Sequence, residues 1–139
     1  MKSKLQLTNL TVGIVMLILF AVTGQLMRHY YHNADLPDVE RLYRRSRHLF
    51  LLMAGLTHSG IGIYITAYQH QVANKLQWIA TALMFLGSCV LVSAFFYEIP
   101  GRIVATPISR LGLYLLLAGA VFHFIGMLVE RYRSKSGQS

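Results

Sequence analysis

The sequence predicts an all-α polytopic membrane protein with four transmembrane helices in one bundle. The chain of 139 residues is 55% hydrophobic and only 13% charged, which is too apolar for a typical soluble domain. Every Lys, Arg, Asp and Glu lies outside four long uncharged windows, and roughly 20 apolar residues suffice for a helix to cross a bilayer core. The windows lack the alternation of membrane β-strands, so helices are expected. A soluble enzyme, a secreted disulfide scaffold and a free nucleic-acid-binding domain are excluded.

The expected spans follow the uncharged windows and cover about residues 5–27, 48–69, 76–97 and 107–129, of which the last has Arg110 in its first turn. The first span follows Lys2 and Lys4, as the core of a secretory signal would. However, its 23 residues exceed the usual length of a signal core, and it does not end in small residues. We therefore expect it to be retained as a membrane span.

The connections between the windows carry signals for helix boundaries. Pro37 followed by Asp38 predicts a turn and a helix start. Thr106 and Pro107 fit the N-cap and first position of the last helix. From Arg131 the sequence is polar, and a frayed tail is expected over 131–139.

The charge distribution does not choose an orientation. An even number of spans puts both chain ends on one side, and that side carries six Lys and Arg residues against seven on the other. Both ends in the cytoplasm is the default expectation. An outside amino end and an antiparallel dimer of dual topology stay open.

Two ionisable side chains, His58 and His123, lie well inside the windows, where such residues are candidates for function. Their spans run in the same direction, and their depths are compatible with a shared site. Under one interpretation they are neutral imidazoles that hydrogen-bond across helix contacts. In the alternative they are axial ligands of a single b-type haem, and a proton relay or a metal site also stays open. No other cofactor is expected.

Small residues form faces on the second and fourth spans. They are expected to let neighbouring helices approach closely, either within the bundle or between copies of the chain. The glycines concerned are Gly55 and Gly62 in the second span and Gly112, Gly119 and Gly126, seven residues apart, in the fourth.

A basic segment precedes the second span and predicts contact with anionic lipid headgroups or simple topological anchoring. Its residues are Arg41, Arg44, Arg45 and Arg47. The preceding loop places His29, His32, Asp35 and Asp38 three residues apart. This run matches no strong metal-ligand pattern, so a solvated loop is expected instead. No loop is long enough to carry a nucleic-acid-binding face.

The single cysteine, Cys89, lies in the middle of the third window and is expected to be a small buried side chain. No nucleophile triad, phosphate loop or carboxylate cluster is present to indicate an enzyme. We therefore expect a non-catalytic component of a homo-oligomer or a larger membrane complex. The alternatives are a small cytochrome carrying one haem between His58 and His123, and a channel or carrier for a small polar solute. The last would rest on a few hydroxyl side chains, namely Thr57, Ser59, Thr81, Ser88 and Ser93.

Overall fold

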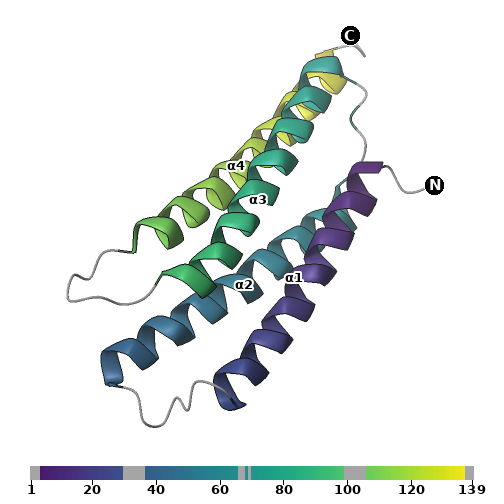
Figure 1. The fold of residues 1–139 in the computed structure, drawn as a ribbon. Helices are drawn as coiled ribbons and strands as arrows, with labels where there is room; N and C mark the ends of the chain where they lie inside the picture. The colour runs from purple at the N-terminus through teal and green to yellow at the C-terminus, as the bar shows by residue number, and fades with distance from the viewer. Residues whose placement is uncertain (1–3, 30–36, 66–67, 69, 99–105, 137–139) are drawn as a thin grey trace.

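The protein is an all-α bundle of four helices, as the sequence predicts (Figure 1). A computed structural model describes residues 4–29, 37–65, 68, 70–98 and 106–136. The helices are α1 (Lys4–His29), α2 (Asp38–Tyr64), α3 (Gln71–Tyr97) and α4 (Pro107–Ser136). No strand occurs among these described residues.

Three helices are long and apolar enough to cross a membrane, namely α1, α3 and the part of α4 up to Arg133. Helix α2 is equally long but more polar, because its first three turns are charged and two histidines follow. The expected second span therefore lies in the helix with the weakest membrane signal. The arrangement nevertheless brings α2 alongside α1 over most of its length (Figure 1).

Two helix starts fall where the sequence signals predict them. Helix α2 begins at Asp38, directly after Pro37, and α4 begins at Pro107. Two helices extend beyond the expected membrane spans. Helix α2 starts ten residues before the uncharged window because the basic segment is itself helical. Helix α4 continues through Ser136 instead of fraying at Arg131, since neither glycine nor proline occurs from Arg131 to Ser136.

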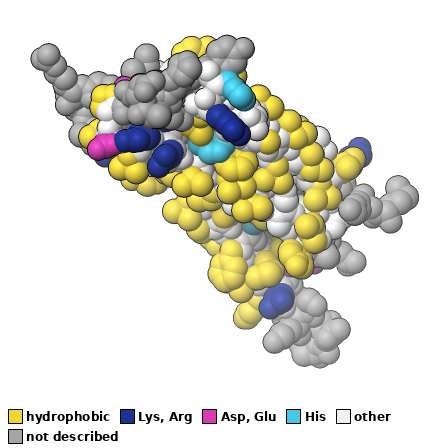
Figure 2. Space-filling view, turned by 90° about the horizontal axis from the view of Figure 1, so that it is seen from below, with side chains coloured by type: hydrophobic (Ala, Val, Ile, Leu, Met, Phe, Trp, Pro, Cys, Tyr) yellow, Lys and Arg dark blue, Asp and Glu magenta, His cyan; other side chains and the backbone are white. Residues whose placement is uncertain are grey.

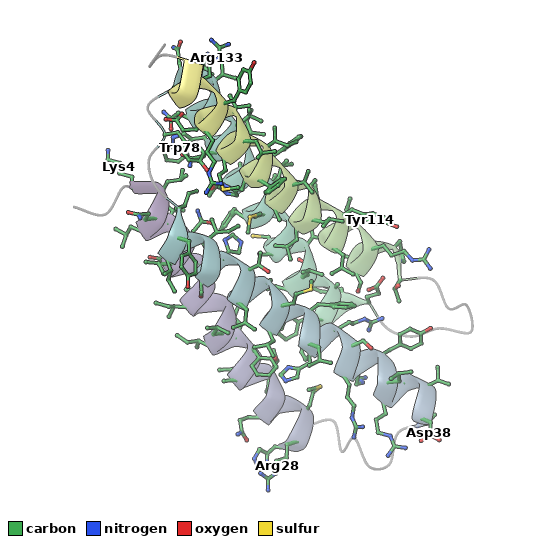
Figure 3. All side chains as sticks on the ribbon, turned by 180° about the vertical axis from the view of Figure 1, so that it is seen from behind. Lys4, Arg28, Asp38, Trp78, Tyr114 and Arg133 are labelled. Atoms are coloured by element: carbon green, nitrogen blue, oxygen red, sulfur yellow. The ribbon has the colours of Figure 1, made fainter. Side chains whose placement is uncertain are left out.

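The four helices form two antiparallel hairpins, α1 with α2 and α3 with α4 (Figure 1). The hairpins meet mainly through α2 and α3, and this contact is less extensive than either pairing within a hairpin. The start of α1 and the end of α4 lie at one end of the bundle, called here the near end, and the opposite end is the far end. Figure 3 shows Lys4 and Arg133 at the near end and Arg28 and Asp38 at the far end.

The surface between the two ends is apolar. Large hydrophobic side chains are exposed on all four helices; examples are Ile18 on α1, Leu56 on α2, Leu86 on α3 and Leu117 on α4. Figure 2 shows hydrophobic side chains covering much of the visible face, with Lys and Arg toward its ends. Soluble proteins place their large apolar side chains inside, so this surface is suited to lipid.

The interior has layers of different polarity. A buried apolar cluster of Met16, Leu51, Ala54, Met84, Leu91 and Leu116 occupies the middle of the bundle. Buried polar side chains lie toward both ends of the bundle. On α3 the two groups overlap, because Ser88 lies between Met84 and Leu91 of the cluster. In α2, for example, Leu51 and Ala54 separate Arg47 from His58. These two polar layers contain the candidate sites.

Candidate functional site

The polar layer toward the near end is centred on His58, whose side chain is completely buried. Its Nδ1 lies 3.0 Å from Oδ1 of Asn9 on α1, and its Nε2 lies 3.1 Å from Oγ of Ser88 on α3. Both ring nitrogens are therefore occupied, and one side chain of α2 joins α1 to α3. This hydrogen bonding satisfies a polar group that would be costly to bury alone.

Asn9 extends the same network toward α4. Its Nδ2 donates to the backbone oxygen of Leu5 at 3.0 Å and to Oγ1 of Thr81 at 3.1 Å. Thr81 Oγ1 in turn lies 3.2 Å from Nε2 of His123. The five side chains of Ser88, His58, Asn9, Thr81 and His123 thus form one chain of contacts, the polar network, in which all four helices take part.

The two histidines named by the sequence belong to this one network, but Asn9 and Thr81 connect them. A haem iron needs a ring nitrogen with a free lone pair on each side. Ligation by His58 would therefore require breaking its bond to Asn9 or to Ser88. The geometry favours the interpretation of hydrogen bonding across helix contacts.

Asn9 is not among the residues predicted from the sequence, although the sequence carries a signal for it. Asn9 is a lone amide inside an uncharged window, and such a group in a membrane helix needs a partner. Thr81 and Ser88 were noted only as possible lining of a solute path. The structure gives both of them histidine partners.

The polar layer toward the far end is a buried ion pair between Arg47 and Glu98. Arg47 Nε lies 3.4 Å from Glu98 Oε2, and Arg47 Nη1 donates to the backbone oxygen of Glu98. The Glu98 carboxylate also accepts from the backbone N–H groups of Ile108 at 3.1 Å and Ser109 at 3.2 Å, as well as from the Ser109 hydroxyl. Glu98 therefore caps the start of α4 with a negative charge, where a helix favours one.

The four arginines of the basic segment have different surroundings. Arg47 is buried against Glu98, so its side chain faces the bundle interior. Arg41 pairs with Asp38, and Arg44 pairs with Glu40 at 2.8 Å. Arg45 is exposed. The hypothesis of a headgroup contact therefore depends on the other three arginines, with Arg45 the most accessible.

The glycine faces lie inside the hairpins. A Cβ atom on Gly55 would approach Leu17 of α1 to 2.9 Å, and one on Gly62 would lie 2.7 Å from the Leu10 backbone nitrogen. Gly13 of α1 makes a similar approach to Ser59.

On α4 the same test separates the three glycines. A Cβ on Gly112 would meet Leu91 at 2.8 Å, and one on Gly119 would meet Met84 at 2.3 Å. At Gly126 the nearest atom, from Tyr68, would be 3.4 Å away, which is an ordinary contact. The neighbours of Gly112 and Gly119 therefore leave no room for a side chain. Those of Gly126 leave room for one methyl group.

Cys89 is exposed rather than buried, contrary to expectation. The position of Cys89 in the sequence predicts how deep it lies along the helix, but not toward which side its side chain points. The side chain lies on the outer face of α3. There it borders an apolar groove of about 380 Å³ between α1 and α3, together with Val12, Val15 and Phe85. A second groove of about 290 Å³ lies between α2 and α4.

Metal binding has no support among the described residues, where no group of three or more His, Cys, Asp or Glu side chains could hold an ion. Of the loop run, His29 ends α1 and Asp38 begins α2. His32 and Asp35 lie outside the described residues.

The fold and the site together define a helical bundle of membrane type with a polar interior at two depths. No protein-family model, curated protein or solved structure matches this chain. Its function must therefore be argued from its own residues.

Proposed function

We propose that the chain is an integral membrane protein that crosses the bilayer four times, with α2 as the fourth span. The three apolar helices support membrane insertion. Helix α2 is antiparallel to α1 and in close contact with it, and its polar groups His58 and Arg47 are turned toward partners inside the bundle. Because these polar groups have hydrogen-bond and ion-pair partners, the free energy required to place α2 in lipid is lower. Both chain ends then lie on one side, with the cytoplasm as the default.

We further propose that the protein is a non-catalytic membrane component that works as a homo-oligomer or as an accessory subunit. The observation that carries this proposal is the polar network itself. Both nitrogens of His58 and the hydroxyls of Ser88 and Thr81 are used to join helices. Groups committed to such bonds serve assembly of the bundle, and the chain offers partners an apolar outer surface.

The structure also gives a reason to prefer this role over a proton relay. A continuous relay needs groups that can each accept and release a proton. In the polar network the link between the two histidines includes the Asn9 amide, which has no titratable proton near neutral pH. The network therefore suits a fixed helix contact better than proton movement.

Three measurements on one purified sample test the proposal. Protein from haem-replete cells should be colourless after dithionite reduction, should not raise solute flux in liposomes, and should give a native mass above 15.7 kDa in nanodiscs. A Soret band that is lost on substitution of either His58 or His123 would establish the cytochrome alternative. Solute flux above that of protein-free liposomes would establish the carrier, and a lone monomer that joins no larger assembly in its native membrane would contradict the subunit role.

A further inference from the structure

The proton positions in the polar network follow from one backbone carbonyl. The oxygen of Leu5 can only accept a hydrogen bond, so the atom of the Asn9 amide that faces it at 3.0 Å must be the NH₂ group. The second proton of that group points to Thr81 Oγ1. The remaining amide atom, Oδ1, can only accept, so His58 must carry a proton on Nδ1.

The hydrogen bonds that the hydroxyl groups of Ser88 and Thr81 make to the two histidines can then be considered. A neutral His58 with its proton on Nδ1 has an acceptor at Nε2, and the Ser88 hydroxyl proton is shared between this nitrogen at 3.1 Å and the backbone oxygen of Met84 at 3.0 Å. Thr81 accepts from Asn9, and among the described residues His123 Nε2 at 3.2 Å is the one acceptor within reach of its own proton, so that proton is donated there. His123 consequently carries its ring proton on Nδ1.

The bonds of the polar network from His58 through Asn9 and Thr81 to His123 therefore all donate in the same direction. Hydrogen bonds arranged in this way polarise one another, which strengthens the donor at the end of the series. That donor is the His123 Nδ1–H, which is buried and has no partner among the described residues. His123 as a whole is 7% exposed. An unpaired donor at such a place is costly unless an acceptor binds there.

We propose that His123 Nδ1–H is a binding site for one small neutral hydrogen-bond acceptor, a water molecule held between α3 and α4. The burial of His123 excludes a larger ligand. The surroundings toward the near end are the least crowded of the α4 glycine face, because a Cβ on Gly126 would have no neighbour closer than 3.4 Å. This inference is independent of the proposed function.

Solid-state NMR of the ¹⁵N-histidine-labelled protein in lipid bilayers at neutral pH tests the site, with signals assigned by replacing each histidine in turn. His58 and His123 should both be neutral with the proton on Nδ1. Magnetisation transferred from water should reach the His123 Nδ1–H directly. The exposed His29 is the positive control, and the His58 Nδ1–H, bonded to Asn9, is the negative control.

A variant pair tests the direction of the bonds. Thr81→Val removes the hydroxyl that donates to His123 Nε2, so His123 should lose its preference for a proton on Nδ1, whereas Thr81→Ser should retain it. A proton on Nε2 of His123 in the unsubstituted protein would overturn the assigned direction. Absence of water transfer to His123 under conditions where His29 receives it would overturn the binding site.

Discussion

Replacement of Gly119 by alanine should destabilise the bundle by a predictable amount. The added Cβ would lie 2.3 Å from Met84 Cγ, 2.7 Å from the Ala80 backbone oxygen and 3.0 Å from the Met84 backbone nitrogen. Two of these atoms are backbone, so the overlap is relieved only if α3 and α4 move apart. Met84 is itself completely buried and has little room to turn aside. Overpacking of this kind costs about 1–3 kcal/mol.

The matched control is Gly60→Ala on α2, where an added Cβ would meet no atom within 4 Å. Both variants gain the same intrinsic helix propensity, about 1 kcal/mol for alanine over glycine. The difference between them therefore isolates the packing cost of about 1–3 kcal/mol at Gly119. Gly126→Ala should behave like the control, because its nearest contact would be 3.4 Å.

The assay is unfolding in mixed micelles by titration with a denaturing detergent, followed by circular dichroism. The expected order of stability places Gly60→Ala and Gly126→Ala at or above the unsubstituted protein and Gly119→Ala below it. Equal unfolding midpoints for Gly119→Ala and Gly60→Ala would refute the close approach of α3 and α4. In that case the α4 glycine face would lie against lipid.

Two further predictions concern the far end of the bundle. Glu98→Ala should lower the free energy of unfolding by about 3–5 kcal/mol, because the buried Arg47 loses its partner; adding Arg47→Met should restore part of this loss in the same unfolding assay, and no restoration would show that the charge of Arg47 is not the cause. Arg45→Gln should reduce the retention of anionic lipid in native mass spectrometry, at about 1 kcal/mol per basic residue, and more than Arg44→Gln does, because Glu40 already pairs with Arg44. Equal retention in both variants and the parent would contradict a headgroup contact.

The four long uncharged windows predicted the four helices, because a helix that is to cross a bilayer needs roughly 20 apolar residues. The helix starts at Asp38 and Pro107 were also predictable, since proline has a strong local preference for the first turn. These signals are local in the sequence, and each can be recognised without knowing which helix lies beside it.

The partners of the buried polar residues could not be predicted in the same way. His58 and Asn9 are 49 residues apart in the sequence, and Arg47 and the Glu98 backbone oxygen are 51 apart. Helical periodicity tells which residues share a face, but it does not tell how that face is turned relative to a neighbouring helix. For this reason Arg47 resembled a surface anchor.

The two polar layers differ from the glycine contacts in which helices they join. The closest glycine approaches lie within the hairpins, between α1 and α2 and between α3 and α4. The bonds from Asn9 to Thr81, from Ser88 to His58 and from Arg47 to Glu98 instead join one hairpin to the other.

For a bundle that lies in lipid, as proposed above, this division has a physical reason. Apolar helix surfaces gain little by leaving lipid for one another, so van der Waals packing alone leaves the relative position of two hairpins weakly determined. Hydrogen bonds and an ion pair at two depths determine it more strongly, because any slip along or around the contact breaks several of them at once. The apolar cluster between the two layers, which includes Leu51 and Leu91, then packs in only one register. We infer that the buried polar residues determine the relative position of the two hairpins, while the glycines determine how closely the two helices of each hairpin pack.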